Sequence, residues 1–81
     1  EGKKVQLSPK EFRLMEVLAK NIPNIVNYEQ ISSEIWGYYE VNMKNRIKYL
    51  VHLIRKKINE INSDCDVIIA SDQIGYRIRT E

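Results

Sequence analysis

The stretch NMKNRIKYLVHLIRKKI, residues 42–58, decides how this chain folds. Apolar residues recur along it at alternating spacings of four and three: Ile47, Val51, Ile54, Ile58 and, just beyond it, Ile61. This repeat is typical of an α-helix with one buried side. At roughly 100° per residue, the opposite side carries a different set: Asn45, Arg46, Tyr49, His52, Leu53 and Lys56. We therefore expect a helix over about residues 42–60 with an apolar back and a cationic, partly aromatic front.

The positive charge of the chain is gathered on this one element. Residues 42–58 contain six of the 13 basic residues and none of the 11 acidic ones, although the net charge is only +2. A cationic helix suits the major groove of double-stranded DNA, which admits one helix between walls of phosphate. The same charge would also serve a solvated helix face. Both interpretations stay open on charge alone.

Length and composition predict one small folded domain over residues 1–81. The hydrophobic fraction of 43% is ordinary for a globular chain. The single cysteine, Cys65, cannot form an internal disulfide, which fits a cytoplasmic protein. No apolar run approaches the roughly 18 residues of a membrane span. Because the sequence begins at Glu1 without a methionine, we expect a fragment of a longer chain.

Two further helices are predicted upstream. Residues 4–7 could form a short strand, and residues 9–20 then form a helix that Ser8 caps and Glu11 closes as a capping box. Pro23 prevents its continuation. After a short β-bridge at residues 25–26, Asn27 caps a second helix that Gly37 ends.

The C-terminal residues 67–79 predict a β-hairpin. Residues 67–70 form one strand and residues 74–79 the returning one, in which Tyr76 and Ile78 alternate with Arg77 and Arg79. A hairpin that follows the basic helix can lie beside it as a wing. The expected fold class is therefore α+β: a winged helix-turn-helix with three helices, a C-terminal wing and a short N-terminal strand.

Several motifs resemble the OmpR/PhoB-type output domains of bacterial two-component response regulators. The similar stretches are LSPKEF at residues 7–12, YEQI at 28–31, IWG at 35–37, LIRKKI at 53–58 and GYR at 75–77. Together with their spacings they cover nearly the whole chain. The resemblance implies a DNA-binding transcriptional regulator whose third helix reads the major groove. In the family a four-stranded sheet precedes the first helix, and here only its last strand can be present.

The resemblance also implies positions of contact. Those in the recognition helix are Asn45, Arg46, Tyr49, Leu50, His52, Leu53, Arg55 and Lys56. Asn27, Tyr28 and Trp36 match positions near the phosphate backbone. The loop of residues 37–41, with Tyr38 and Tyr39, matches a segment that meets RNA polymerase in some members. Members also bind tandem half-sites as dimers.

For several of these residues more than one role stays open. We expect Arg46 to reach a guanine edge or a phosphate, and Tyr49 either to contact a thymine methyl or to pack against the wing. Arg55, Lys56, Arg77 and Arg79 are candidates to hold phosphates, and we expect some of them to be merely solvated. Trp36 is expected to belong more to the core than to a contact surface, and Tyr38 and Tyr39 either cover the core or meet a partner.

This sequence departs from the family at the proposed contact surface. Family members often have histidine at Leu50 and arginine at Leu53, and their wing often carries an Arg-Gly pair where Asp72 and Gln73 stand here. An acidic wing tip would be repelled by phosphates. The alternative hypothesis is therefore a winged-helix protein-interaction module with weak or lost sequence-specific DNA binding.

No catalytic pattern is present in the sequence. We find no nucleophile–base pairing, no glycine-rich phosphate loop and no metal-ligand spacing, since His52 is the only histidine. We therefore expect neither an enzyme nor a cofactor or metal site.

Overall fold

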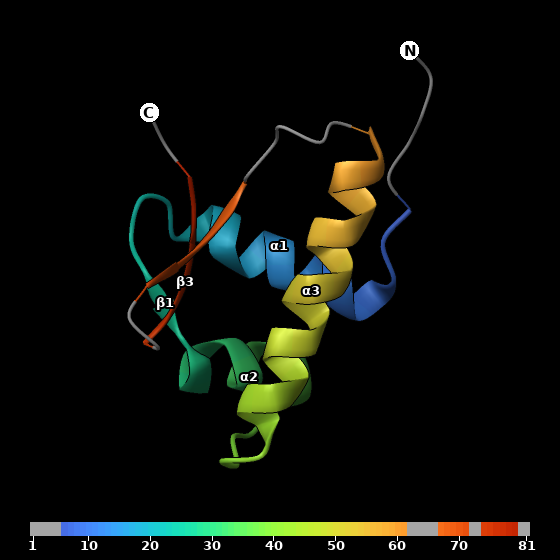
Figure 1. Ribbon diagram of the computed structural model, residues 1–81. Helices are drawn as coiled ribbons and strands as arrows, with labels where there is room; N and C mark the ends of the chain where they lie inside the picture. Colours follow the sequence, from blue (N-terminus) through green and yellow to red (C-terminus); the bar gives the residue numbers. More distant parts are fainter. Residues whose placement is uncertain (1–5, 62–66, 72–73, 80–81) are drawn as a thin grey trace.

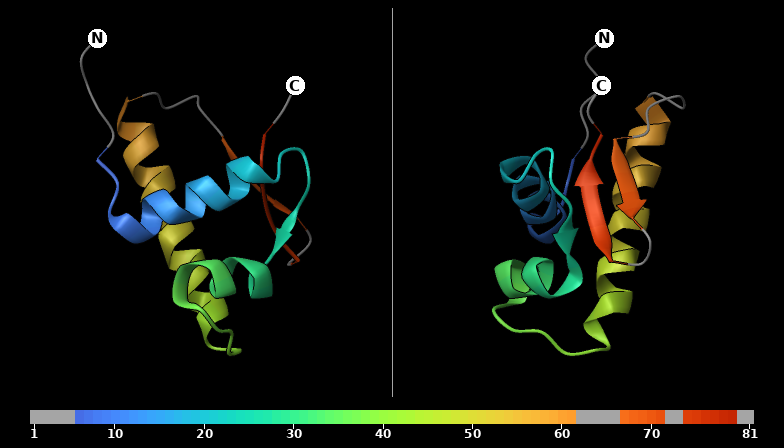
Figure 2. Two further views of the ribbon diagram at one scale, coloured as in Figure 1. Left: turned by 180° about the vertical axis from the view of Figure 1, so that it is seen from behind. Right: turned by 90° about the vertical axis from the view of Figure 1, so that its left-hand side faces the viewer.

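Three helices and a small antiparallel sheet make up the computed structural model, which describes residues 6–61, 67–71 and 74–79 (Figure 1). The elements in chain order are α1 (Pro9–Lys20), β1 (Val26–Asn27), α2 (Tyr28–Trp36), α3 (Met43–Ile61), β2 (Ile68–Ser71) and β3 (Gly75–Ile78). In the right-hand view of Figure 2, α1 and α2 lie on the left and α3 lies on the right. The sheet lies at the side of the domain that faces the viewer. The predicted α+β winged-helix order is confirmed.

The core lies where the three helices and the sheet meet. Each contributes fully buried side chains. Those from α1 and α2 are Leu14, Val17, Leu18 and Ile31, those from α3 are Ile47, Val51 and Ile54, and those next to or in the sheet are Val26 and Ile68. Ile47, Val51 and Ile54 of the apolar repeat therefore face inward, as the spacing predicted. Ile58 is half-buried, and Ile61, the last residue of the repeat, is 44% exposed, so the prediction is wrong there.

The first turn of α1 is tied to α3 through Glu11. The predicted capping box is present: the Glu11 amide donates to Ser8 Oγ (3.2 Å) and the Ser8 amide donates to Glu11 Oε1 (2.9 Å). Lys57 Nζ of α3 donates to the same Oε1 at 2.7 Å and also to the Gln6 carbonyl. Burial by itself would raise the pKa of the Glu11 carboxyl. The hydrogen bonds from Lys57 and Ser8, together with the Lys57 charge, nevertheless hold it below its ordinary 4.5.

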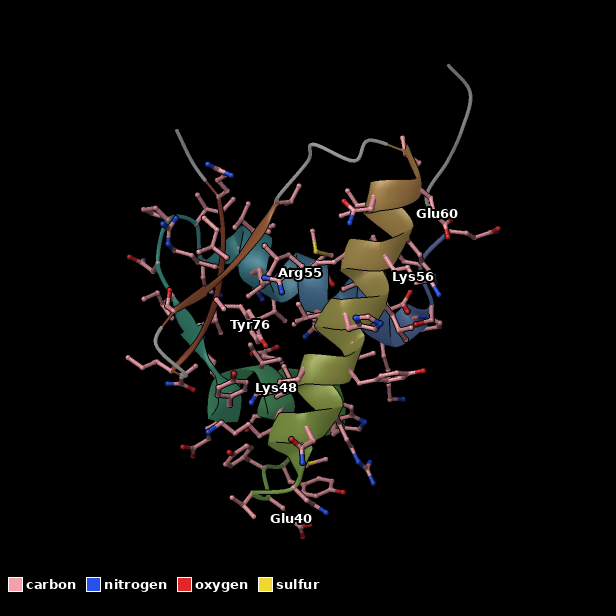
Figure 3. All side chains as sticks on the ribbon, viewed as in Figure 1. Glu40, Lys48, Arg55, Lys56, Glu60 and Tyr76 are labelled. Atoms are coloured by element: carbon pink, nitrogen blue, oxygen red, sulfur yellow. The ribbon has the colours of Figure 1, made fainter. Side chains whose placement is uncertain are left out.

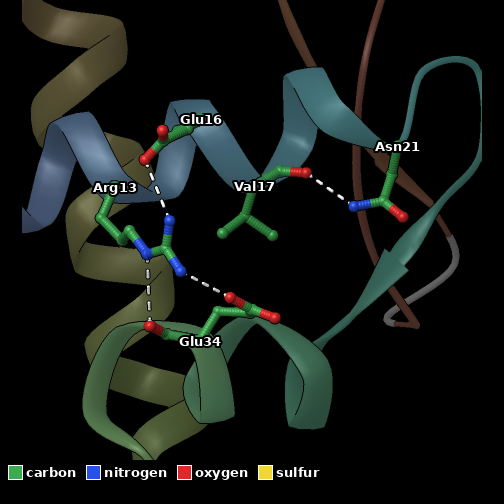
Figure 4. A network of polar contacts seen from close by, with 5 residues as sticks. All are labelled: Arg13, Glu16, Val17, Asn21 and Glu34. Atoms are coloured by element: carbon green, nitrogen blue, oxygen red, sulfur yellow. Dashed lines mark hydrogen bonds and ion pairs between the residues drawn. The ribbon is translucent and has the colours of Figure 1, made fainter.

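A second polar link joins α1 to α2 (Figure 4). Arg13 donates to the Glu34 carboxylate at 2.6 Å and to the Glu34 carbonyl, and it pairs with Glu16 one turn along α1. At the other end of α1, the Asn21 side chain donates to the Val17 carbonyl at 2.7 Å and so satisfies one of the last carbonyls of the helix. The contacts between Arg13 and Glu34 hold α2 against α1 at the surface of the domain.

The sheet has the strand order β1-β3-β2, with both pairs antiparallel. Val26 pairs with Tyr76 and Asn27 with Gly75. At Gly75 the two backbones approach closely, because a Cβ built there would lie 2.0 Å from the Val26 carbonyl oxygen. Only glycine fits this position without moving β1, and β1 leads directly into α2.

Some predicted boundaries are wrong. Of the expected strand at residues 4–7, the described Gln6 and Leu7 lie in no strand, and β1 covers residues 26–27 rather than 25–26. Phe12 of α1 is 60% exposed, so it does not belong to the core. Backbone hydrogen bonds stabilise the N-terminus of α3: the Met43 amide donates to the Glu40 carbonyl, and the Lys44 amide donates to the Val41 carbonyl. Cys65 and the wing tip at Asp72 and Gln73 lie outside the described residues.

We expect Gly75→Ala to destabilise the fold by about 3 kcal/mol, because the added methyl group overlaps the β1 backbone. Gly37→Ala is the matched control: Gly37 has φ +89° but nothing within 4 Å of the added Cβ. Its cost should be only the roughly 1–2 kcal/mol of a left-handed alanine. Urea unfolding of both variants measures the difference, and equal losses would contradict the close approach at Gly75.

Because the folded pKa of Glu11 is lowered, its contribution to stability is present above about pH 4.5 and is lost as the pH falls through the lowered value. We expect Glu11→Gln to cost about 1–2 kcal/mol at neutral pH and to flatten the acid limb of the stability curve. Glu16 is exposed, so Glu16→Gln should change the free energy of unfolding little. Chemical unfolding across the acid range tests this, and parallel acid limbs for wild type and Glu11→Gln would refute it.

Candidate nucleic-acid interface

The outward side of α3 carries most of the predicted site. Asn45, Arg46, Tyr49, His52 and Lys56 are exposed there, and Leu53 is half-buried. Lys48 and Arg55 are also exposed but lie on another side of the helix. Tyr49 is 61% exposed, so it does not pack under the wing. In Figure 3 the Arg55 and Lys48 side chains lie on the side of α3 that faces the sheet, whereas Lys56 points away from it.

The six cations of α3 do not all face solvent freely. Arg55 Nη2 donates to the Ile68 carbonyl of β2 at 2.8 Å, Lys57 is paired with Glu11, and the Lys44 ammonium lies 5.1 Å from the centre of the Tyr28 ring. Arg46, Lys48 and Lys56 are exposed and make no ion pair with another described residue. The cationic surface available to a partner is therefore about half of what the sequence suggested.

A hollow of about 410 Å³ adjoins the first half of α3. Trp36 and Leu50 line it together with Tyr49, and cations border it at Arg46 and Lys10. Trp36 is half-buried against the core, as expected, and shows one side to this hollow. Lys10 comes from the start of α1, far away in sequence, so no local pattern could have indicated it.

A second hollow, of about 380 Å³, lies further along α3 and is lined by His52, Arg55, Lys56, Asn59 and Glu60. Glu60 places one acidic group at the edge of this otherwise cationic surface. Residues 42–58 are free of acidic side chains, but the helix as the structure has it continues to Ile61 and includes this carboxylate.

Leu50 is only 8% exposed and belongs to the core, so little of its side chain is available for the contact that the resemblance implied. Its direction follows from its position one turn from Ile47 and Ile54, on the flank of α3 that packs inward.

Tyr28 is 7% exposed, with its ring edge-on to Tyr76 at 5.7 Å between centroids. The two rings join α2 to β3. Burial is the main cause that raises the pKa of Tyr76 to about 12. The hydrogen bond with Tyr28 and the charge of the Tyr28 phenolate raise it further, and the Arg55 charge lowers it slightly. Tyr28 is thus mainly a packing residue, and the predicted contact of its side chain with phosphate has little surface to use.

The start of α2 and the loop after it are held by short polar contacts. Asn27 caps α2, since its side chain accepts from the Gln30 amide at 2.7 Å. Past Gly37, the Ser32 hydroxyl donates to the Tyr38 carbonyl at 2.5 Å and fixes the loop. Tyr38 is 51% exposed, whereas Tyr39 packs partly against the core. The loop therefore shows Tyr38 to solvent and covers the core with Tyr39.

The described part of the wing presents Arg77 half-buried and Arg79 exposed. Arg77 makes a long contact of 3.5 Å to the neighbouring Ile78 carbonyl. Among the described residues no group of three histidine, cysteine, aspartate or glutamate side chains could hold a metal ion. Within the same ranges no helix is both long and apolar enough to cross a membrane.

A helix-turn-helix pair whose second helix shows a cationic side, followed by a hairpin packed beside it, defines a winged-helix domain. The chain belongs to the family "Transcriptional regulatory protein, C terminal", whose profile matches residues 2–78 and which comprises the OmpR/PhoB-type effector domains of response regulators. The predicted resemblance is confirmed. This is a family of transcription regulators and not of enzymes.

Several transcriptional regulators are similar to this sequence along almost its whole length. It is 34% identical over 74 residues to the transcriptional regulatory protein DltR of Streptococcus agalactiae serotype III, covering 91% of this chain and 33% of the relative. It is 35% identical over 78 residues to CutR of Streptomyces coelicolor, covering 96% and 34%. To KdpE of Staphylococcus aureus it is 33% identical over 80 residues, covering 95% and 34%. The chain thus spans about a third of the length of these relatives.

Solved structures show the same fold. The Klebsiella pneumoniae RstA DNA-binding domain, solved in complex with the RstA box, aligns with a TM-score of 0.79 at 21% identity over 95% of this chain and 76% of that one. The C-terminal domain of the nisin resistance regulator NsrR aligns with a TM-score of 0.77 at 24% identity over 100% of this chain and 81% of that one.

Since the pKa of Tyr76 is raised from 10.0 to about 12, the unfolded chain loses this phenol proton before the folded one. Stability should therefore fall as the pH rises from about 10 to about 12. We expect Tyr76→Phe to remove the late step from the ultraviolet titration of tyrosinate, and Tyr49→Phe, at an exposed position, to leave it. Loss of the late step in Tyr49→Phe instead would contradict the assignment.

Proposed function

We propose that this domain binds double-stranded DNA and regulates transcription, with α3 in the major groove and the wing (residues 67–79) beside the backbone or minor groove. The observation that carries the proposal is the uncovered outward side of α3. There Arg46 and Lys56 are exposed together with Asn45, Tyr49 and His52, and Lys48 is exposed on the side of α3 that faces the sheet. Membership in the family and the DNA complex of the RstA domain support the same function.

The three exposed cations have separate roles in this proposal. Arg46 lies near the start of α3, where a guanidinium can reach the O6 and N7 of a guanine. Lys48 and Lys56 lie at either side of the central residues and would hold the phosphates of the two strands. Tyr49 and the half-buried Leu53 offer apolar surface to a thymine methyl group.

The hollow beside Trp36 extends the surface toward α1. Its lining includes the apolar or aromatic Trp36, Tyr49 and Leu50 and the cations Lys10 and Arg46. A sugar-phosphate strand has the same two characters, an apolar sugar edge and an anionic phosphate. We infer that one DNA strand runs along this hollow, with Trp36 against a sugar and Lys10 toward a phosphate. Asn27 and Arg77 are further candidate backbone contacts.

We further propose that the domain is the C-terminal part of a longer cytoplasmic response regulator that pairs on tandem half-sites. The relatives support the longer protein, because each is about three times as long as the region it shares with this chain. The pairing is carried over from the family resemblance alone. The loop of residues 37–41, with Tyr38 51% exposed and Val41 81% exposed, is the candidate surface for RNA polymerase.

A protein-interaction module remains the alternative function, and one specific observation favours it: apolar Leu53 and Tyr49 stand together on the outward side of α3. The burial of Leu50 weakens it, because one of its proposed contact residues faces the core. Salt separates the two functions, since a phosphate-dominated complex weakens steeply as salt rises and an apolar protein contact much less.

We expect Arg46→Ala to weaken binding to a duplex selected from a random pool by about 1–3 kcal/mol and to relax base preference at one position. Lys56→Ala is the matched control: it should weaken selected and random duplexes alike and lower the salt slope by about 1. Fluorescence anisotropy at several salt concentrations gives both quantities. Equal losses of Arg46→Ala on both duplexes would disprove base reading, and failure to select any duplex would disprove DNA binding.

A further inference from the structure

Arg55 is the one arginine of α3 whose hydrogen bond reaches the wing. Its side chain leaves α3 on the side facing the sheet, and Nη2 donates to the Ile68 carbonyl at 2.8 Å (Figure 3). The adjacent Lys56 points away from the sheet. Both side chains are exposed, but among the described residues only Arg55 has a hydrogen bond to the wing.

The hydrogen-bond pattern of the hairpin explains why the Ile68 carbonyl is available. The Arg79 amide donates to the Val67 carbonyl at 2.7 Å. Bonded and non-bonded pairs alternate along an antiparallel ladder, so Ile69 and Arg77 form the next bonded pair. The backbone groups of Ile68 must then point away from β3.

That direction is the open edge of the sheet. In the strand order β1-β3-β2, no described strand lies beyond β2. The Ile68 side chain is 1% exposed and packed in the core, so its carbonyl sits close to buried surface. A carbonyl there needs a donor, and the Arg55 guanidinium supplies a charged one.

Arg55 also has a small electrostatic effect on the aromatic pair behind the wing: burial raises the pKa of the Tyr76 hydroxyl, and the Arg55 charge lowers it slightly. Tyr76 packs on Tyr28 at the start of α2, and Lys44 of α3 covers Tyr28. The wing is thus attached to α3 at two levels: at Lys44 through the aromatic pair and at Arg55 through a direct hydrogen bond.

We propose that Arg55 is a positioning residue that fixes the wing against α3, and that it is not a phosphate clamp. The proposal rests on the proposed function, because the fixed angle matters when α3 and the wing must meet one duplex together. It assigns the phosphate role at this level of α3 to Lys56 alone. It also replaces the expectation from sequence that both residues hold phosphates.

The test compares Arg55→Met with Lys56→Met, since methionine keeps an unbranched stem and removes the charge. Amide hydrogen exchange is first measured without DNA. We expect the amides of Arg77 and Arg79 to exchange about tenfold faster in Arg55→Met, with Leu18 of α1 unchanged. Lys56→Met should exchange like wild type throughout.

The second measurement is the salt dependence of binding to a selected duplex. We expect Arg55→Met to lose about fivefold in affinity with an unchanged slope of log K against log salt. Lys56→Met should lower that slope by about 0.9, the value for one phosphate contact.

Wing amides that exchange as in wild type in Arg55→Met, or a slope lowered by about 0.9, would overturn the proposal. Equal acceleration at Leu18 would also overturn it, since Arg55 would then support the whole domain and not the wing. If the wild-type chain binds no duplex, DNA binding fails, and the exchange comparison still decides whether Arg55 holds the wing.

Discussion

The burial of one side of α3 is the constraint on which the rest of this structure depends. Five side chains of that helix are buried, and Ile47, Val51 and Ile54 among them are in contact with α1, α2 and the sheet. At roughly 1.5–3 kcal/mol for each large side chain, this burial contributes on the order of 10 kcal/mol. A surface ion pair contributes about 0–1 kcal/mol. The apolar side therefore fixes the rotation of α3, and the cations take the directions that remain.

Those remaining directions are of three kinds, and they have different consequences. The flank toward α1 brings Lys57 to Glu11, a nearly buried carboxylate that also caps α1. The flank toward the sheet brings Arg55 to the edge of β2 and Lys44 to Tyr28. The side opposite the core leaves Lys56 exposed without a described partner. One helix thus organises both the internal ties of the domain and the surface that we propose for DNA.

The proposed interface is assembled from separate parts of the chain. Trp36 at the end of α2 and Lys10 at the start of α1 meet Arg46 and Tyr49 of α3 around one hollow. The wing approaches the same helix from the other flank. The packing of the wing against β1 depends on Gly75, where the β3 and β1 backbones are too close for any side chain. A surface of this kind requires all three helices and the hairpin to be in place at once.

The sequence by itself determined the helices, the hairpin and the side of α3 that faces inward. Periodicity, the capping box at Ser8 and Glu11, and the glycine after α2 are local signals, and local signals fix local structure. Only the tertiary structure decided that Leu50 is buried, that Lys10 joins the hollow, and that Arg55 binds a backbone carbonyl. These outcomes depend on which distant elements lie beside each flank of the helix, and the spacing of residues within one helix carries no information about its neighbours.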